Sequence, residues 1–342
     1  MKNEPLVTIC VPTFNAEKTI QRTLESILSQ TYKNMVVHIS DNASTDNTLT
    51  IVESFSDPRI NIHRQPENIG AEGNFNYCIS LASGKYSAIY HADDVYVQDM
   101  VERQVEFFES TTNVAAVFTE ATLIDENDIE VGKINFPIDL VGESDTRIDF
   151  PTLFKAVLRH ANFLVCPSAM VKTDVLKNIV QRWRGDLFRS SADLDVWLRI
   201  AQCSGIGLIR RPLIRYRIST EQYTAKVRAQ TTRPDFFLVT DYYLEQSEVA
   251  AILNAQDIKN LERLLMRDRV MRAINFYIAG DFASANGLIK NFFGWAALEA
   301  GLKTKRGLGV LVGAIVLKCL LTCHIGDPGQ RLFIKLKQKL NK

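Results

Sequence analysis

Short apolar runs alternate with helix-like segments through the first 120 residues of the chain. Each run has the length of one strand, and the runs lie at 6–11, 36–40, 60–63, 87–90 and 114–118. The segments between them carry apolar side chains at helical spacing, as in residues 16–30, where Asn15 is placed to cap the helix. Strand–helix units in series build a parallel sheet, so we predict a doubly wound α/β domain.

Two adjacent carboxylates, Asp93 and Asp94, follow the fourth apolar run. Ligands of open α/β sheets bind at the carboxyl ends of the strands. Two neighbouring carboxylates repel each other unless a cation lies between them, and Mg²⁺ or Mn²⁺ takes carboxylates together with substrate phosphates. The pair therefore indicates a metal site for a phosphorylated ligand. The alternative is a solvated helix start, where Asp is common.

Charged side chains at other element ends are further candidates. Asp41 ends the second strand, where its carboxylate can accept an N–H of a nucleobase or a ribose hydroxyl, or it can simply form a loop. Asp193 begins a helix whose dipole favours an ionised general base, or it is only an N-cap. Arg215 and Arg217 alternate along a strand and share one face. We assign Arg217 to a diphosphate, with surface acids as the alternative partners.

The rest of the chain is predicted more coarsely. We expect a hairpin or excursion at 125–144, a helix at 150–160, an edge element broken by proline at 163–171, strands at 206–209 and 213–218, and helices at 235–254, 256–279 and 281–298. These elements suggest two domains, a catalytic one at 1–220 and a helical one at 221–342.

Charge is concentrated at the end of the chain. The net charge of +1 gives no sign of a nucleic-acid partner, but residues 301–342 carry nine Lys or Arg and one acid. Residues 307–325 are apolar and near the length of a membrane span, with Lys318 at the centre, where a bilayer disfavours it. We expect a helix that lies on a membrane surface, or else a helix packed on the body.

The cysteines and the beginning of the chain bear on the compartment. The six cysteines include no CxxC pair, so neither a zinc site nor a disulfide framework is indicated, and a reducing cytosol is expected. No signal peptide is expected, because no basic segment followed by an apolar one precedes Leu6.

Five motifs in register give the chain a resemblance to a known family. They are Val11–Asn15, Asp41–Asp46, Asn68–Gly70, Ala82–Tyr86 and His91–Asp94. Together with Asp193 they resemble the family 2 glycosyltransferases over about residues 5–220. The resemblance implies a GT-A fold, which is Rossmann-like with a mainly parallel sheet, here followed by a helical C-terminal extension.

The resemblance also implies roles for single residues. The donor pocket would be lined by Pro12, Thr13, Phe14, Asn15, Asn68, Gly70 and Asn76. Asp41 would contact the base, Asp93 the ribose or the metal, and Asp94 the metal that bridges the diphosphate. Asp193 would deprotonate an acceptor hydroxyl, which attacks the anomeric carbon with inversion.

Four positions depart from the family pattern. His91 stands where an acid is common, and Ala192 replaces the Glu before the base. Ser219 stands near the place of a His that is common after the Tyr-Arg pair, and Phe75 replaces an Arg before Asn76. These departures leave open which carboxylate ligates the metal, what the third ligand is, and one contact to the nucleotide.

The sequence therefore predicts a metal-dependent inverting glycosyltransferase on the cytosolic face of a membrane. It would use a nucleotide-sugar donor, UDP-linked, and a saccharide or lipid-linked acceptor of a surface polysaccharide, with Mn²⁺ or Mg²⁺ as cofactor. A sugar nucleotidyltransferase is an alternative, although the 12–15 loop lacks the Gly-rich, basic phosphate loop of that class. A nucleotide-sugar-binding or scaffold protein that has lost catalysis is another.

Overall fold

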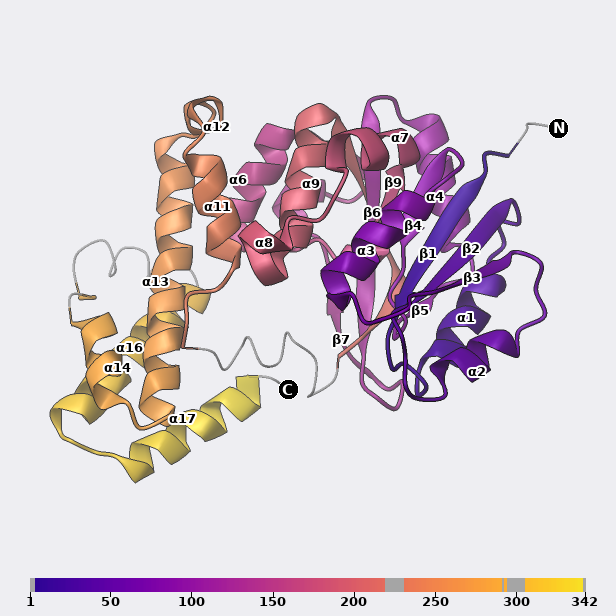
Figure 1. Cartoon of the computed structure of the whole chain (residues 1–342). Helices are drawn as coiled ribbons and strands as arrows, with labels where there is room; N and C mark the ends of the chain where they lie inside the picture. The colour runs from indigo at the N-terminus through magenta and orange to yellow at the C-terminus, as the bar shows by residue number, and fades with distance from the viewer. Residues whose placement is uncertain (1–3, 219–230, 291, 294–304, 341–342) are drawn as a thin grey trace. The chain divides into compact units, whose positions relative to one another are not determined.

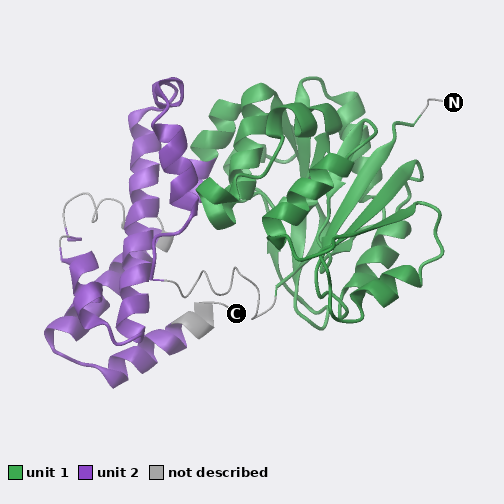
Figure 2. Ribbon diagram, viewed as in Figure 1, with its two compact units in different colours: residues 1–156, 162–218 green, residues 157–161, 219–342 purple. Residues whose placement is uncertain are grey.

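The structure, a computed structural model, describes residues 4–218, 231–290, 292–293 and 305–340. The chain divides into two compact units, shown in Figure 2. Unit 1 contains residues 1–156 and 162–218, and unit 2 contains residues 157–161 and 219–342.

Unit 1 is built on one mixed sheet with the order β3-β2-β1-β4-β9-β6-β10-β5, to which β7 adds beside β6 and β8 beside β10 (Figure 1). The strands are β1 Val7–Thr13, β2 Met35–Asp41, β3 Ile60–Arg64, β4 Tyr86–Ile89, β5 Val95–Tyr96, β6 Val114–Ile124, β7 Glu130–Ile134, β8 Thr146–Ile148, β9 Met170–Lys172 and β10 Gly205–Arg217. The four strands from β3 to β4 are mutually parallel, and β6 is parallel to β10. The predicted α/β class with a mainly parallel sheet is confirmed.

Helices cover the sheet and bury its apolar side chains. The helices between β1 and β10 are α1 Ile20–Leu28, α2 Thr48–Glu53, α3 Gly70–Leu81, α4 Met100–Ser110, α5 Ile138–Val141, α6 Phe150–His160, α7 Thr173–Val175, α8 Gly185–Phe188 and α9 Ala192–Cys203, and the end of α6 belongs to unit 2. The order β3-β2-β1-β4 reverses direction after β3, so right-handed crossovers place α3 on the face opposite α1 and α2. The core contains apolar side chains of β1, β2, β4 and β6, fully buried at Ile9, Val37 and Val117.

Three observed strands, β6, β9 and β10, differ from the predicted ones. Residues 163–171 were expected at an edge, but β9 lies inside the sheet between β4 and β6, because Pro167 falls in the preceding 3₁₀ turn and costs no ladder hydrogen bond. The strands expected at 206–209 and 213–218 are one strand, β10, which passes Pro212 through an irregularity in register. Strand β6 continues six residues beyond 118, through buried polar side chains such as Thr119.

Unit 2 is helical in its described residues. Its helices are α11 Phe236–Leu244, α12 Ser247–Ala251, α13 Ala255–Ile278, α14 Phe282–Ile289, α16 Lys305–Thr322 and α17 Asp327–Leu340. A capping box of Asn254 and Asp257 begins α13, and the Asp281 side chain accepts the Ser284 N–H at the start of α14. One apolar cluster joins α13, α14, α16 and Phe333 of α17.

Helix α16 corresponds to the apolar segment expected at 307–325. Among the described helices of the chain, none combines the length and the apolar character that a membrane crossing needs. Leu311, Ala314 and Leu317 bury one side of α16 in the cluster of unit 2. Leu308, Val312 and Ile315 lie on its solvent side.

Candidate active site

The carboxyl ends of β1, β2 and β4 meet at one edge of the sheet, because these strands are parallel. Thr13 at the end of β1 pairs in register with Asp41 at the end of β2. The segment that follows β4 leads directly into Asp93 and Asp94. The topology thus brings three of the sequence motifs to the edge where ligands of such sheets bind.

Asp41 is buried at this edge, with an exposed fraction of 3%. Its Oδ2 accepts the backbone N–H of Ser44 at 3.2 Å, so the residue does shape the loop after β2. Its Oδ1 is also buried and has no hydrogen-bond partner among the described residues. An unsatisfied buried acceptor costs about 1–3 kcal/mol, which a ligand N–H or hydroxyl would recover.

Asn15 ties the loop after β1 to the loop after β2. Its backbone N–H donates to Ser44 Oγ at 3.0 Å, and its side-chain oxygen accepts the Thr45 N–H at 2.8 Å. Asn15 has a φ of 47° and does not cap α1, which begins at Ile20, so the expected cap was wrong. Asn is one of the few residues that adopt this backbone region readily.

The other predicted residues of the first loop point in different directions. Thr13 is buried and donates its hydroxyl to the carbonyl of Val11 at 3.1 Å, and Pro12 is partly buried. Phe14 is 46% exposed and is the only aromatic side chain of residues 12–15. It therefore remains accessible to a planar ligand, whereas Thr13 supports the loop from inside.

Asn68 and Gly70 form a turn that is held by Asn42. The Asn42 side chain donates to Asn68 Oδ1 at 2.9 Å and accepts the Ile69 N–H at 2.9 Å. Asn68 Oδ1 also accepts the Gly70 N–H at 2.8 Å, and Gly70 has a φ of 77° that favours glycine. The side-chain oxygen of Asn68 therefore accepts its hydrogen bonds from within the protein.

Asn76 on α3 is connected to the segment before α8. Its Oδ1 accepts the backbone N–H of Trp183 at 2.7 Å, and the neighbouring Phe75 ring packs against Trp183 at 5.2 Å between centroids. Glu72, one turn earlier, accepts the Gly185 N–H at 3.0 Å. The side-chain carbonyl of Asn76 therefore positions protein backbone, and its contact with a nucleotide stays a prediction.

Asp94 is fully buried and is only partly satisfied by the protein. Its Oδ1 accepts the backbone N–H of Arg217 at 2.8 Å, while its Oδ2 has no hydrogen-bond partner among the described residues. Burial raises the pKa of the Asp94 carboxyl well above its ordinary value, and the negative charge of Asp93 raises it further. A bound cation would reverse both effects by stabilising the ionised form.

The backbone around the acidic pair is fixed from α1 and β5. Thr19 and Thr23 donate their hydroxyls to the carbonyl of Ala92 at 2.9 and 3.0 Å. Thr23 also donates to the carbonyl of Asp94 at 2.8 Å. The His91 N–H donates to Tyr96 Oη at 2.8 Å. The two carboxylates are therefore held on a rigid loop.

Arg217 is buried, and its guanidinium is largely used inside the protein. It donates to the carbonyl of Asp93, to the carbonyl of Asp125 and to Asp128 Oδ1, at 2.8, 2.8 and 2.5 Å. Arg215 donates to the Asp128 carbonyl at 2.9 Å, so the two arginines share a face and contact the same turn. Contact of Arg217 with a diphosphate stays a prediction.

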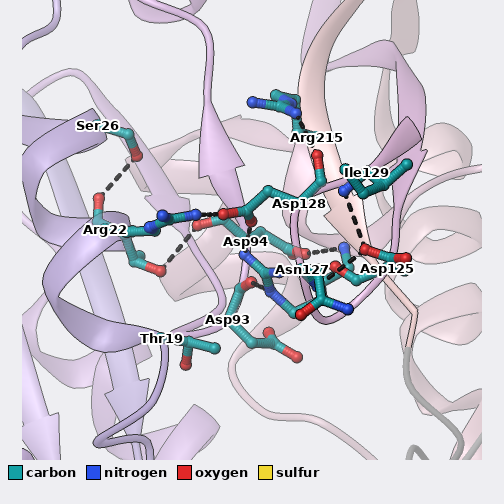
Figure 3. A network of polar contacts seen from close by, with 12 residues as sticks. Thr19, Arg22, Ser26, Asp93, Asp94, Asp125, Asn127, Asp128, Ile129 and Arg215 are labelled. Carbon is teal, nitrogen blue, oxygen red and sulfur yellow. Dashed lines mark hydrogen bonds and ion pairs between the residues drawn. The ribbon is translucent and has the colours of Figure 1, made fainter.

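Asp128 is the centre of a network that the sequence did not indicate. Figure 3 shows it between Arg22 of α1 and Arg215 of β10, and it forms an ion pair with Arg22 as well as with Arg217. A hollow of about 400 Å³ beside the network is lined by Arg22, Glu25, Ser26, Ser29, Val95, Asp128 and Arg215. It contains none of the predicted donor residues. The only signal in the sequence was a polar turn at 125–128, whose partners are far away in the chain.

Asp193 lies at the start of α9, as predicted, and is partly buried. Burial raises its pKa to about 6, against the opposing hydrogen bonds from the Leu194 N–H at 2.7 Å and the Asn162 side chain at 3.4 Å. Burial and then the charges of Asp193 and Asp94 raise the pKa of the Cys166 thiol. The thiol therefore lies within electrostatic range of both carboxylates.

The residues after β4 can hold a divalent cation. In the described part of the chain, ligand atoms of His91, Asp93 and Asp94 lie within 4.8 Å of one another. The buried, unpartnered Oδ2 of Asp94 belongs to this group. Carboxylate oxygens at this spacing suit Mg²⁺ or Mn²⁺, so the residues present fit the predicted cofactor.

Comparison with known proteins agrees with this geometry. A family model described as "Glycosyl transferase family 2" matches residues 8–180. An uncharacterised glycosyltransferase of Methanocaldococcus jannaschii is 28% identical over 70% of this chain and 80% of its own length. The Escherichia coli protein WfaP, named a UDP-Glc:alpha-D-GlcNAc-diphosphoundecaprenol beta-1,3-glucosyltransferase, is 32% identical over 57% of this chain and 70% of its own length.

Two solved structures share the fold across most of the chain. S. aureus TarS 1-349, in complex with UDP-GlcNAc, has a TM-score of 0.61 and 16% identity over 97% of this chain and 92% of its own. The mannosyltransferase PcManGT of Pyrobaculum calidifontis, in complex with GDP-Man and Mn²⁺, has a TM-score of 0.52 and 17% identity over 97% and 86%. These likenesses confirm the GT-A fold with C-terminal helices. The chain belongs to glycosyltransferase family 2 and is a glycosyltransferase.

Proposed function

We propose that this protein transfers a sugar from a UDP-sugar to a hydroxyl of a lipid-linked saccharide, with inversion at the anomeric carbon and with a divalent cation bound. The observation that carries the proposal is a pair of buried carboxylate oxygens, Asp41 Oδ1 and Asp94 Oδ2, which lack partners among the described residues. Asp41 ends β2 and Asp94 follows β4, so both lie at the carboxyl ends of parallel strands. This edge is where ligands of open α/β sheets bind.

Asp41 accepts the imide N–H of uracil in this proposal. The nucleobase needs one strong hydrogen-bond acceptor in a site from which water is excluded. Asp41 Oδ1 is a buried acceptor that receives no hydrogen bond from the described residues. Phe14 offers an exposed ring for stacking, and Thr13, Pro12 and Asn15 hold the wall of the pocket. The donor in the name of the E. coli relative supports a UDP-sugar.

Asp93 and Asp94 hold the cation in this proposal. When bound, Mn²⁺ or Mg²⁺ neutralises charge that develops on the departing diphosphate. Arg217 fixes the Asp94 carboxylate through its backbone N–H, and its guanidinium fixes the Asp93 carbonyl. The two aspartates are therefore oriented before the nucleotide-sugar binds, which reduces the reorganisation that the reaction needs.

Asp193 acts as the general base. With a pKa of about 6 it is mostly ionised at pH 7 and still basic enough to take a proton. It removes the proton of the acceptor hydroxyl, whose oxygen forms a bond to the anomeric carbon. The bond from that carbon to the diphosphate breaks on the opposite side, and the electron pair leaves with the diphosphate.

The acceptor and the membrane are proposed from unit 2 and from the relatives. Helix α16 carries exposed apolar side chains at positions 308, 312 and 315. Residues 301–342 have a large excess of positively charged side chains. This combination suits a helix on an anionic leaflet. The E. coli relative is named for a diphosphoundecaprenol acceptor, which supports a peripheral position on the cytoplasmic face of a membrane.

The test measures donor binding and transfer together. Full-length protein is screened against UDP-, GDP- and TDP-sugars with and without Mn²⁺, by thermal shift and by release of the nucleotide with a lipid-linked acceptor. We expect a metal-dependent shift with one UDP-sugar, and Asp94→Asn should lower transfer at least about a hundredfold. Asp174→Asn is the control and should behave as wild type. Asp174 is exposed and lies at the end of the sheet where β4 begins, opposite the acidic pair.

Other results would point elsewhere. Donor binding without release or transfer, under every acceptor tried, would favour an inactive nucleotide-sugar-binding protein. Formation of a nucleotide-sugar from a nucleoside triphosphate and a sugar phosphate would favour a nucleotidyltransferase. Transfer that is indifferent to Asp94→Asn and to chelation would remove the metal from the proposal.

A further inference from the structure

His91 lies at the cation site that the acidic pair forms. Its Nδ1 is 3.9 Å from Asp94 Oδ2, and a ligand atom of each of His91, Asp93 and Asp94 falls within 4.8 Å of the others. Asp94 is fully buried, and its Oδ2 has no hydrogen-bond partner among the described residues. A ring nitrogen of His91 therefore lies near this carboxylate oxygen.

The spacing is unsuited to a direct hydrogen bond. Nitrogen and oxygen atoms that share a hydrogen lie about 2.7–3.2 Å apart, which is well below 3.9 Å. Two ligands of one cation, each at about 2.1 Å, lie between about 3 and 4.2 Å apart, depending on the angle at the ion. The distance between His91 Nδ1 and Asp94 Oδ2 falls inside that interval, so an ion fits where a hydrogen bond does not.

The ring of His91 is also held in place. Its edge-to-face contact with Phe75 has a centroid distance of 5.7 Å, and Phe75 in turn packs on Trp183. Tyr96 receives the His91 N–H and donates its hydroxyl to the His91 carbonyl at 3.3 Å. Tyr96 therefore positions the His91 backbone, and the Phe75 ring positions its side chain, while His91 Nε2 is buried without a hydrogen-bond partner among the described residues.

We infer that His91 is a third protein ligand of the cation and that it sets the preference of the site for one ion over another. The inference rests on the proposed function, because it concerns the same cation. Mg²⁺ binds oxygen and retains water, whereas first-row transition ions accept imidazole nitrogen more readily. A site of one imidazole and two carboxylates therefore favours Mn²⁺ over Mg²⁺, and an acid in place of His91 would weaken that preference.

The test detects the nitrogen directly. Full-length protein is loaded with Mn²⁺ and examined by electron spin-echo envelope modulation, with and without UDP, and the affinities for Mn²⁺ and Mg²⁺ are measured by calorimetry. We expect ¹⁴N modulation from a bound imidazole in the wild type, and its loss in His91→Asn and His91→Asp. The ratio of Mn²⁺ to Mg²⁺ affinity should fall at least about tenfold in His91→Asp.

Matched controls separate the inference from the metal site as such. His324→Asn replaces an exposed histidine of unit 2 whose φ of 54° asparagine also adopts, and it should keep the full modulation. Bound Mn²⁺ without ¹⁴N modulation in the wild type, or modulation that survives in His91→Asn, overturns the inference and leaves the proposed metal site standing. If Mn²⁺ does not bind in either the presence or absence of UDP, the metal site of the proposed function fails as well.

Discussion

Several residues of this site reduce the stability of the folded protein, and the fold alone does not explain why they are present. Asp41 and Asp94 each bury a carboxylate oxygen without a partner among the described residues, and Asp193 has a pKa raised by burial. Such groups reduce stability, and proteins retain them where ligands complete them. Stability and activity should therefore respond in opposite directions to substitutions at these positions.

Asp193 provides the clearest case. Its pKa of about 6 exceeds the ordinary 3.8, so between these values the folded protein binds more protons than the unfolded chain, and the stability contribution of this residue falls as pH rises. Asp193→Asn removes this loss. We expect transfer to fall about 10²–10⁴-fold while the free energy of unfolding at pH 7.5 stays the same or increases.

A pH profile checks the same residue from the wild-type side. The rate at saturating donor should rise with pH and reach half its plateau near pH 6, since only ionised Asp193 accepts the proton. Rates are measured between pH 5 and 8 by nucleotide release, with urea unfolding of both proteins. A residual rate in Asp193→Asn that keeps the same rise near pH 6 would assign the base to another group.

Sequence reasoning was most useful for residues at strand ends. The positions of Asp41, Asp93, Asp94 and Asp193 could be predicted because strands and helices place their ends regularly, while their roles stay predictions. Arg217 was predicted to contact a diphosphate, with surface acids as the alternative partners. Its partners are the turn at 125–128 and the acidic pair, and contacts so distant in sequence leave no local pattern.

At the scale of elements, one buried aspartate connects α9 to the segment before it. Asp195 is fully buried and forms ion pairs with Arg184 and Arg199. Arg199 also donates to the carbonyls of Val180 and Arg182, so the segment 180–184 is bound to α9. This is the same segment whose Trp183 contacts Phe75 beside His91.

Removal of Asp195 should therefore loosen both elements. Asp195→Ala leaves two arginines without their shared carboxylate, and we expect a loss of about 3–5 kcal/mol in the free energy of unfolding. Asp186→Ala breaks an exposed pair with Arg182 in the same region and should cost less than about 1 kcal/mol. Urea unfolding followed by tryptophan fluorescence measures both, and equal losses would show that the buried cluster has no special weight.

Element boundaries were predictable where one periodicity dominated. The alternation of β1, α1, β2 and α2 is visible in the sequence because most of their buried positions are apolar. Strand β9 was misplaced because three residues next to a proline are too few to define a strand. The second half of β6 was missed because its buried side chains include the polar Thr119 and Glu120. The Thr119 hydroxyl donates to the adjacent Glu120 carbonyl, and the Glu120 carboxylate accepts the Phe136 N–H.

For the whole molecule, the two units divide the proposed tasks. Unit 1 contains the acidic site, and unit 2 contains the exposed apolar stripe of α16, defined by Leu308, Val312 and Ile315. A helix that is apolar on both sides is typical of proteins that meet another apolar phase. Membrane binding can therefore be tested with substitutions in unit 2 that leave unit 1 unchanged.

We expect the full-length protein to sediment with vesicles that contain phosphatidylglycerol. Replacement of all three stripe residues by glutamine should weaken binding at least about tenfold, because it removes exposed apolar area from the contact. Ile138→Gln, an exposed isoleucine of unit 1, is the control and should have no effect. Equal sedimentation of the triple variant, or binding to neutral vesicles that ignores salt, would argue against the proposed surface.

The hydrogen bond from the Arg217 backbone to Asp94 also has a consequence for synthesis. Its two residues are 123 positions apart, so the acidic pair leaves the ribosome roughly 6–25 s before the strand that orients it, at about 5–20 residues per second. Until then Asp94 has no backbone donor and the loop is unsupported from β10. The nascent chain therefore cannot bind its nucleotide-sugar substrate until nearly all of unit 1 has emerged. A protein truncated before residue 217 would contain the acidic motif but not the complete site.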